Sequence, residues 1–222
     1  MRNLRILAVD DHEMTIIGYK YILEDIDFED YKVHVDIANS YDLGKEKIEA
    51  SSKSLYYDII FLDIQMFTSE EKRPQTGEDL GILARTIVPE SKVVFMSSFN
   101  DNYRINSILK SVNPDGYMVK SDIDPKSLRD LVNTVMTVPP YYSSKALVAI
   151  RKTMANDIVL DENDRKILYY ISLGTKTKDI VSYVSISLPS IENRKRHLKT
   201  IFGIDKQNDL ALITEAKKRG FI

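Results

Sequence analysis

The sequence contains no cysteine, which excludes disulfide bonds and thiolate metal sites. No apolar run approaches the roughly 20 residues that a bilayer-spanning helix needs. The sequence shows neither an internal repeat nor a low-complexity tract. Its N-terminus, MRNLRILAVDD, runs directly into an acidic pair and lacks the pattern of a signal peptide. We therefore expect a soluble, cytoplasmic protein that has no membrane partner.

The length of 222 residues suggests one large or two small domains, and 43% hydrophobic residues allow each to bury a core. The net charge of −2 conceals two unlike parts. Residues 151–222 carry 14 Lys and Arg against 9 Asp and Glu, whereas residues 1–150 carry 17 against 24. The difference suggests different partners, and a basic C-terminal part suits nucleic-acid binding, although solvated surfaces often reach the same charge.

Residues 1–138 alternate short β-forming runs with helical patterns. Strands are expected at residues 4–9, 31–38, 58–62, 92–96 and 116–119. Helices are expected at residues 13–25, 40–52, 78–88, 102–111 and 124–136. Five β–α units in this order predict an α/β domain with a doubly wound parallel sheet and helices on both faces. The continuous apolar run Ile59–Leu62 is typical of a central strand.

The segment 139–157 is expected to link two domains, because it holds paired prolines, tyrosines and serines. Within it, Ala146–Met154 can form a helical turn or two. Residues 158–222 show no strand pattern and predict a small all-α domain with four helices, at 162–173, 176–183, 188–202 and 208–219. Gly174 is expected to end the first of these helices, and Ser187 is expected to cap the third.

Polar residues stand at the carboxyl ends of four predicted strands, where sites form in open parallel sheets. They are Asp10 and Asp11 after the first strand, Asp63 at the end of the third, Ser97 at the end of the fourth and Lys120 after the fifth. Each alone is more often a helix cap or a solvated side chain. Together, at one edge of a sheet with strand order 2-1-3-4-5, they predict a site. Three converging carboxylates repel one another, and Mg²⁺, which takes oxygen ligands, would neutralise them.

With the metal bound, the Asp63 carboxylate can accept a phosphoryl group. The three equatorial oxygens of that group would be met by Mg²⁺, by the Lys120 ammonium, and by the Ser97 hydroxyl together with a backbone N–H. Gln65 and Phe99 lie two residues beyond Asp63 and Ser97, where they could screen the phosphoryl group from water. A Mg²⁺-dependent phosphatase is an alternative, but it would want an aspartate where Gln65 stands.

The segments ILAVDDHE, IIFLDIQM, VVFMSSF and GYMVKSD resemble the receiver domain of two-component response regulators, over roughly residues 3–136. The resemblance implies a flavodoxin-like sheet and phosphorylation of Asp63 by a sensor histidine kinase. It also implies a Mg²⁺ site in which Asp11, Asp63 and the backbone carbonyl of Gln65 hold the ion and Asp10 assists through water. Ser97 and Tyr117 would form a switch pair, with Tyr117 moving into the space that Ser97 vacates.

The sequence departs from this family's pattern in three places. Met66-Phe67 stands where the family usually has Met-Pro, and residues 68–76, TSEEKRPQT, lengthen the loop that follows. Lys120 is followed by Ser121, where a proline is often found. The long loop borders the predicted site, so the departures concern loop dynamics and partner choice more than phosphorylation.

The stretch SISLPSIENRKRHLKTIFGI (185–204) has the two-faced pattern of a helix that enters the DNA major groove. One face is apolar and holds Ile191, Leu198, Ile201 and Phe202. The other is polar and holds Glu192, Asn193, Arg196 and Lys199. Such a helix needs one face for anchoring and one for reading bases. A solvated helix in a helical bundle would show the same division, so this helix alone does not decide between the two.

Residues 160–219 resemble the LuxR-type helix-turn-helix domain, through the turn at Gly174, the short helix after it and the entry SISLPSIENR. The resemblance implies that base edges are contacted by Glu192, Asn193 and Arg196. Phosphate contacts are expected from Lys176, Lys178, Lys199 and Lys206. Arg194 stands where the family usually has histidine and is also expected to lie at the DNA.

Together the two resemblances imply a NarL/FixJ-like transcription factor with a receiver domain (1–138), a linker (139–157) and a DNA-binding domain (158–222). Phosphorylation of Asp63 by a histidine kinase would switch formation of a homodimer and binding to promoter double-stranded DNA. No enzymatic activity is expected beyond Mg²⁺-dependent self-phosphorylation and autodephosphorylation. The alternative is a phosphorylation-independent DNA-binding or protein-docking regulator whose receiver site is vestigial.

Overall fold

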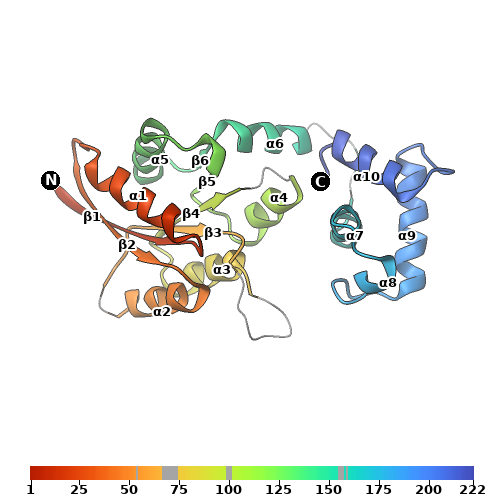
Figure 1. Ribbon diagram of the computed structural model, residues 1–222, viewed down its shortest axis with the longest axis horizontal. Coiled ribbons are helices and arrows are strands. Elements are labelled where there is room, and N and C mark those ends of the chain that lie inside the picture. The colour runs from red at the N-terminus through yellow and green to blue at the C-terminus, as the bar shows by residue number, and fades with distance from the viewer. Residues whose placement is uncertain (54, 67–74, 99–101, 155–157, 159) are drawn as a thin grey trace. The chain divides into compact units, whose positions relative to one another are not determined.

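The computed structural model describes residues 1–53, 55–66, 75–98, 102–154, 158 and 160–222 (Figure 1). The chain divides into two compact units, which we call the N-terminal unit (residues 1–100 and 107–147) and the C-terminal unit (residues 101–106 and 148–222). Among the described residues, no helix combines the length and the apolar character needed to cross a membrane.

The N-terminal unit is built on a six-stranded, all-parallel sheet with strand order β2-β1-β3-β4-β5-β6. Its strands are β1 (Arg2–Val9), β2 (Tyr31–Ala38), β3 (Ile59–Asp63), β4 (Lys92–Ser97), β5 (Gly116–Val119) and β6 (Tyr141–Tyr142). Its helices are α1 (Glu13–Asp25), α2 (Tyr41–Ser51), α3 (Gly77–Ile87) and α5 (Pro125–Thr137), with the 3₁₀ turn η1 (Lys120–Asp122) and the part of α4 (Asn102–Ser111) that begins at Ser107. The predicted doubly wound sheet and its order 2-1-3-4-5 are confirmed, and β6 extends that sheet by a strand that the sequence did not predict.

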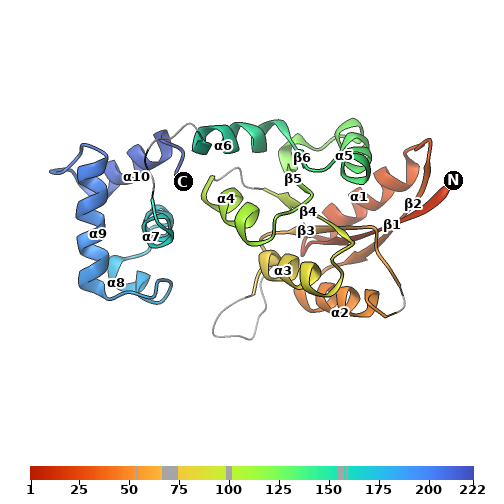
Figure 2. The same cartoon turned by 180° about the vertical axis from the view of Figure 1, so that it is seen from behind.

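Helices cover both faces of the sheet. Helices α1 and α5 pack together on one face, and α2 and α3 pack together on the other, as the views from opposite sides show (Figure 2). Strand β3 is buried along its whole length because β1 and β4 flank it and helices cover both of its faces. Burying one isoleucine or leucine side chain contributes about 1.5–3 kcal/mol, so the run Ile59–Leu62 makes β3 a rigid support for the residue that ends it.

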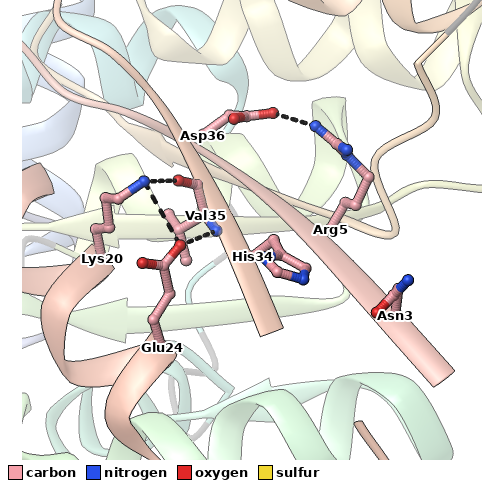
Figure 3. Close-up of a pocket in the computed structure, with 7 residues that line it drawn as sticks. All are labelled: Asn3, Arg5, Lys20, Glu24, His34, Val35 and Asp36. Carbon is pink, nitrogen blue, oxygen red and sulfur yellow. Dashed lines mark hydrogen bonds and ion pairs between the residues drawn. The ribbon is translucent and has the colours of Figure 1, made fainter. Parts of the chain in front are cut away.

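The outer edge of the sheet, at β2, is closed by side chains. Helix α1 lies beside it, and its Glu24 carboxylate accepts a hydrogen bond from the Val35 N–H at 2.9 Å. The Lys20 ammonium donates to the Val35 carbonyl, also at 2.9 Å. These residues line a hollow of about 340 Å³, in which Arg5 and Asp36 form an ion pair (Figure 3). Because these charged groups pair with one another, the hollow belongs to the framework of the sheet.

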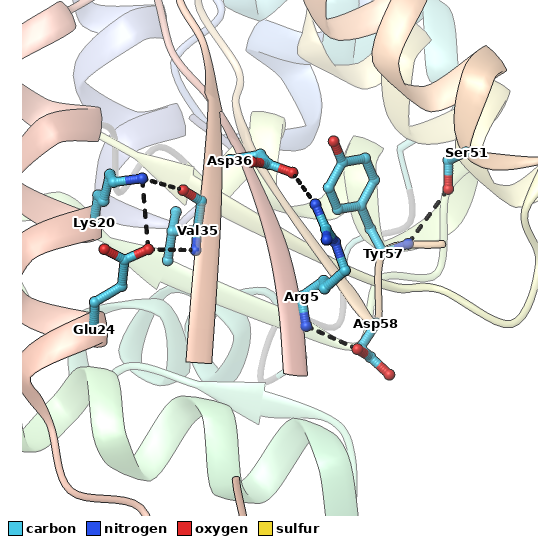
Figure 4. Close-up of polar contacts among 8 residues, drawn as sticks. All are labelled: Arg5, Lys20, Glu24, Val35, Asp36, Ser51, Tyr57 and Asp58. Carbon is cyan, nitrogen blue, oxygen red and sulfur yellow. Dashed lines mark hydrogen bonds and ion pairs between the residues drawn. The ribbon is translucent and has the colours of Figure 1, made fainter. Parts of the chain in front are cut away.

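A polar network fixes the amino end of β3 against its neighbour β1. The Asp58 carboxylate accepts a hydrogen bond from the Arg5 N–H at 2.8 Å (Figure 4). It also accepts a charged hydrogen bond from the Arg2 guanidinium at 2.6 Å. The Tyr57 N–H donates to the Ser51 hydroxyl at the end of α2. The register of β3 is therefore set at this end by hydrogen bonds, which leaves the opposite end to carry Asp63.

The expected linker is partly built into the N-terminal unit. Strand β6 pairs with β5, and helix α6 (Ser144–Met154) follows it directly. Ser143 is buried between them, where its N–H donates to the Tyr117 carbonyl at 3.0 Å and its hydroxyl accepts from the Val119 N–H at 3.1 Å. The segment 139–157 therefore contains a strand that the sequence did not predict, and its role as the linker between two domains remains a prediction. Two tyrosines are too short a run for strand periodicity to reveal.

The C-terminal unit contains the four predicted helices: α7 (Glu162–Ser172), α8 (Thr177–Ile180), α9 (Leu188–Ile201) and α10 (Asp209–Lys218). Gly174, at φ +80°, follows the end of α7 as predicted, in a conformation that favours glycine. Helix α8 is shorter than predicted, because residues 181–183 form turns. Ser187 occupies the N-cap position of α9 without a capping bond, since its hydroxyl pairs with that of Ser190 at 2.9 Å.

Candidate functional site

Three carboxylates meet at the carboxyl edge of the sheet, and we call Asp10, Asp11 and Asp63 the acidic cluster. Strands β1 and β3 pair with Val9 opposite Leu62, so the residues that follow, Asp10 and Asp63, come side by side. Asp10 and Asp63 are buried, whereas Asp11 is exposed. Ligand atoms of these three residues and of His12 all lie within 4.8 Å of one another. The predicted convergence is therefore present.

Lys120 brings the positive charge to this cluster. It follows β5 as the first residue of η1, and its side chain is largely buried. The ammonium lies 2.6 Å from Asp10 Oδ2 and 3.3 Å from Asp63 Oδ1. One cation therefore faces two buried acids, and Asp11 adds a third negative charge beside them.

The electrostatics of Asp63 follow from this imbalance. Burial raises the pKa of the Asp63 carboxyl, Lys120 lowers it, and the neighbouring Asp10 raises it again, with a net upward shift. The same carboxylates act on Tyr19 of α1. Burial, and then the charges of Asp10 and Asp63, raise the pKa of this phenol far above its usual range. The structure therefore holds more negative charge here than its own cations neutralise, and a bound cation would relieve it.

His12 is a member of this site that the sequence reasoning missed. Its backbone N–H donates to Asp10 Oδ1 at 3.0 Å, which shapes the turn into α1. Its ring Nδ1 lies 2.7 Å from Asp11 Oδ1 and 3.2 Å from Asp10 Oδ1. The signal was available in the run Asp10-Asp11-His12, because an imidazole next to two carboxylates is a possible metal ligand.

Gly77 fixes the backbone of Asp63 from behind. The Gly77 N–H donates to the Ile64 carbonyl at 3.2 Å, and a Cβ added at Gly77 would lie 1.8 Å from the carbonyl oxygen of Asp63. Helix α3 begins here, with the Asp79 carboxylate accepting from the Thr76 N–H at 2.7 Å. A side chain at position 77 would push the end of β3 away, and the sequence analysis did not assign this role to the glycine.

The predicted switch residues lie on the strands expected for them. Ser97 ends β4 and Tyr117 lies on β5, and both are fully buried. Gln65 follows β3 and is half-buried. The switch roles of Ser97 and Tyr117, and the metal contact of the Gln65 carbonyl, remain predictions. Phe67, most of the long loop (68–74) and Phe99 lie outside the described residues.

Helix α9 has the two faces that its sequence indicates. Ile191 and Leu198 are fully buried. Phe202, beyond the helix end, packs with Leu198 in one hydrophobic cluster, and Ile191 lies in another. The predicted base-reading residues are exposed: Glu192, Asn193 and Arg196. The predicted phosphate contacts Lys176, Lys178 and Lys206 are exposed as well. The division into an anchoring and an open face is confirmed, and the individual DNA contacts remain predictions.

Other cations of α9 are engaged inside the C-terminal unit. Arg194 binds Asp161 at 2.6 Å and Asp164 at 2.7 Å, which ties α9 to the start of α7. Asp209, at the start of α10, is held by Lys195 at 2.8 Å and by Lys199 at 3.0 Å. Arg194 and Lys199 therefore have framework partners, and their predicted DNA contacts would compete with these. Lys195 is buried.

These ion pairs lower the pKa values of their carboxyl groups, whereas the pKa of Asp63 is raised. Burial raises the pKa of Asp209, but Lys195 and Lys199 outweigh it and hold that pKa below its usual value. For Asp161, burial is likewise outweighed by the bonds from the Asp164 N–H and from Arg194, so its pKa is also lowered. Asp161 and Asp209 are therefore neutralised by cations of the same unit.

Comparison with known proteins gives relatives that match along nearly the whole chain, whereas no family model matches the sequence. Transcriptional regulatory protein MctR of Rhizobium johnstonii is 26% identical over 205 residues, covering 90% of this chain and 88% of that protein. Oxygen regulatory protein NreC of Staphylococcus epidermidis is 23% identical over 234 residues, covering 97% of this chain and 98% of that protein.

Solved structures resemble the whole chain in fold. A structure of two RcsB dimers bound to two parallel DNAs matches with a TM-score of 0.63 at 16% identity, covering 97% of this chain and 98% of the other. RcsB from Salmonella enterica serovar Typhimurium, bound to a promoter in the presence of phosphomimetic BeF₃⁻, matches with a TM-score of 0.62 at 17% identity. The match covers 96% of this chain and 98% of the RcsB chain. The response regulator ChrA matches with a TM-score of 0.51 at 19% sequence identity, and the match covers both chains in full.

Proposed function

We propose that this chain, which belongs to the response regulators with a receiver domain and a LuxR-type helix-turn-helix domain, is a phosphorylation-controlled transcription factor of a two-component system. We assign the receiver to residues 1–138 and DNA binding to residues 158–222. The observation that carries the proposal is the position of Asp63. It is a buried carboxylate at the end of the central strand, with Asp10 beside it and the Lys120 ammonium 3.3 Å away.

The donor set of the acidic cluster fits Mg²⁺. The buried Asp10 Oδ2 is paired with the Lys120 ammonium at 2.6 Å, and Asp63 shares the same ammonium at 3.3 Å. An additional cation would offset the remaining negative charge of the three carboxylates. The residues that would hold Mg²⁺ are Asp10, Asp11, Asp63 and the backbone carbonyl of Gln65. When bound, the ion supplies positive charge to the oxygens of the incoming phosphoryl group.

The residues of this chain divide the phosphoryl transfer among them. An Asp63 carboxylate oxygen forms the new bond to phosphorus, and the bond between phosphorus and the histidine nitrogen of a sensor kinase breaks, leaving the electron pair on that nitrogen. Lys120 pairs with a phosphoryl oxygen once the Asp63 charge has passed to the phosphoryl group. The rigid end of β3, fixed by Gly77, keeps the carboxylate in line for attack.

Phosphorylation would be read out through Ser97 and Tyr117. The Ser97 hydroxyl would donate to a phosphoryl oxygen, and the Tyr117 ring would occupy the space that opens. A two-state surface of this kind can control assembly of a homodimer. Two copies of the exposed face of α9 would then bind half-sites about one turn of promoter DNA apart.

Phosphorylation of the intact chain by a small phosphodonor tests this proposal. The chain is incubated with the donor and Mg²⁺, and its mass is measured before and after. We expect one phosphoryl group on the wild type and none on Asp63→Asn. Failure of the wild type to gain mass, or an equal gain in Asp63→Asn, would refute the proposal. Omission of Mg²⁺ is the control for the metal, and it should slow the gain strongly.

A further inference from the structure

Lys120 stands between residues that are held by the segment following α5. On its N-terminal side, the N–H of the buried Val119 donates to the Ser143 hydroxyl at 3.1 Å, and Ser143 is buried as well. The Ser143 N–H in turn donates to the Tyr117 carbonyl at 3.0 Å. Because Ser143 follows β6 directly, it continues the hydrogen bonding of β5 beyond the two residue pairs that β5 forms with β6.

The residues after Lys120 are held by the first turn of α6. The Ser121 hydroxyl accepts a hydrogen bond from the Lys145 ammonium at 2.6 Å. The Asp122 carboxylate accepts one from the Lys145 N–H at 3.0 Å and pairs with the Lys145 ammonium at 3.3 Å. Burial raises the pKa of Asp122, but hydrogen bonds from Lys145 and from the Ser143 side chain outweigh it and lower that pKa. We call residues 143–145 the β6–α6 junction.

The junction holds the chain at a place where the sequence departs from the receiver pattern. Ser121 stands where a proline is often found, and a proline would restrict the backbone of the residue before it, Lys120. In this chain the neighbours of Lys120 are restrained by the β6–α6 junction instead. The Lys120 ammonium lies 2.6 Å from Asp10 Oδ2 and 3.3 Å from Asp63 Oδ1, so a small shift of its backbone would change both distances.

We propose that the β6–α6 junction is a working part of the phosphoacceptor site, in which Ser143 and Lys145 are positioning residues that act through Lys120. The inference rests on the proposed function, in which the Lys120 ammonium pairs with a phosphoryl oxygen. A misplacement of about 1 Å in a reacting site can slow a reaction about a hundredfold. Ser143 bonds in a buried place, whereas the Lys145 side chain is 48% exposed and water screens its charge. Ser143 is therefore expected to contribute more than Lys145.

A purely structural role for the junction makes a different prediction. Loss of the Ser143 hydroxyl would then lower the stability of the chain and leave the transfer rate of the folded protein unchanged. Ser91 provides the comparison, because it is also buried and its hydroxyl donates to the Tyr57 carbonyl at 2.7 Å, before the amino end of β4. If the junction positions Lys120, loss of the Ser143 hydroxyl slows the transfer and loss of the Ser91 hydroxyl does not.

Transfer rates of the intact chain separate the two roles. The wild type and its variants are incubated with a saturating small phosphodonor and Mg²⁺, and the gain in mass is followed at a temperature at which circular dichroism shows each to be folded. We expect Ser143→Ala to react about tenfold more slowly than the wild type, and Ser143→Thr, which keeps the hydroxyl, to recover most of that loss. Ser91→Ala should react as the wild type does.

A second pair of variants tests the other side of Lys120. Lys145→Ala removes the partner of Ser121 and of the Asp122 carboxylate, and we expect it to react about threefold more slowly than the wild type. Lys152→Ala removes another exposed lysine of α6 and should leave the rate unchanged.

Two results would overturn the inference: a Ser143→Ala rate equal to that of the wild type, or equal losses of rate in Ser143→Ala and Ser91→Ala. Should Ser143→Ala fail to fold, the lysine variants decide, and equal rates for Lys145→Ala and Lys152→Ala overturn it. Phosphorylation of the wild type on Asp63 together with any of these results refutes only the positioning inference. A wild type that gains no phosphoryl group refutes the proposed function, and the positioning inference with it.

Discussion

Two clusters, one in each unit, match carboxylates with cations in opposite proportions. In the N-terminal unit, Asp10 and Asp63 share Lys120, and Asp11 adds a further negative charge. In the C-terminal unit, Asp209 is held by both Lys195 and Lys199. The pKa of Asp63 is raised, by burial first, whereas the pKa of Asp209 is lowered although burial opposes it. The same residue type is left short of positive charge in the acidic cluster and is supplied in excess at Asp209.

The contrast separates a site from a framework. A buried carboxylate with too few cations is costly to the folded state unless a ligand completes it, which is what a phosphoacceptor site requires. A carboxylate with two cations needs nothing from outside, and it holds those cations in place. The number of positive charges on α9 therefore overestimates how strongly this helix can attract DNA, because carboxylates of the same unit already neutralise some of these charges.

The largest effect is expected at the backbone of the acidic site. Gly77→Ala places a Cβ against the Asp63 carbonyl, with only 1.8 Å between them before relaxation, so the end of β3 must move. We expect a loss of about 3 kcal/mol in the free energy of unfolding, measured with urea. Gly18→Ala on α1 is the matched control, because open space surrounds it, and it should stabilise the chain by up to about 1 kcal/mol. Similar values for the two variants would contradict the close approach.

Removing one cation from each unit should distinguish the site from the framework. Arg194→Met leaves Asp161 and the largely buried Asp164 without their cation, and we expect a loss of about 2 kcal/mol after allowance for solvent screening. Lys120→Met likewise removes the cation that pairs with Asp10 and Asp63 of the acidic cluster. Excess Mg²⁺ should restore the thermal stability of Lys120→Met and leave Arg194→Met unchanged. Restoration of both, or of neither, would show that the two clusters do not differ as described.

The pH dependence of stability should have opposite signs for Asp63 and Asp209. The folded-state pKa of Asp63 is raised. Its contribution to the free energy of unfolding is therefore fully present below the unfolded-state pKa, and it is lost as pH rises through the folded-state pKa. For Asp209, whose folded pKa is lowered, the contribution is present above the unfolded pKa and is lost as pH falls through the folded pKa. Melting temperatures between about pH 3 and 7 check this. Asp209→Asn should reduce the fall in melting temperature as pH decreases. Asp63→Asn should reduce the fall in melting temperature as pH increases.

The smallest expected effect concerns an exposed lysine of the C-terminal unit. Lys178→Ala should weaken binding to a duplex of random sequence and reduce the salt dependence of log K by about 0.9, because one phosphate contact releases about that many counterions. The free energy of unfolding should not change. Lys32→Ala, on the exposed side of β2, is the control and should bind DNA as the wild type does. A salt slope that stays constant in Lys178→Ala would remove this residue from the DNA interface.

The sequence predicted those parts of the fold that depend on local periodicity. Strands such as β2 and helices such as α1 begin and end where their apolar patterns do, and Asp63 was identified because a buried run ends on it. Features that depend on contacts distant in sequence were missed. Strand β6 forms only because β5 is there to pair with it, and the role of Gly77 depends on the backbone of Asp63. The burial of Lys195 likewise depends on Asp209, which its position in the sequence does not reveal.

The two ends of the sheet have a consequence for how copies of this chain can associate. At β2, the outward groups of Val35 already bond to Lys20 and Glu24, and at β5 the carbonyl of Tyr117 already accepts from Ser143. A foreign strand would have to break these bonds before it could pair, and β6 itself offers a ladder of only two residues. Strand addition is therefore disfavoured at Val35 of β2 and at the short margin of β6.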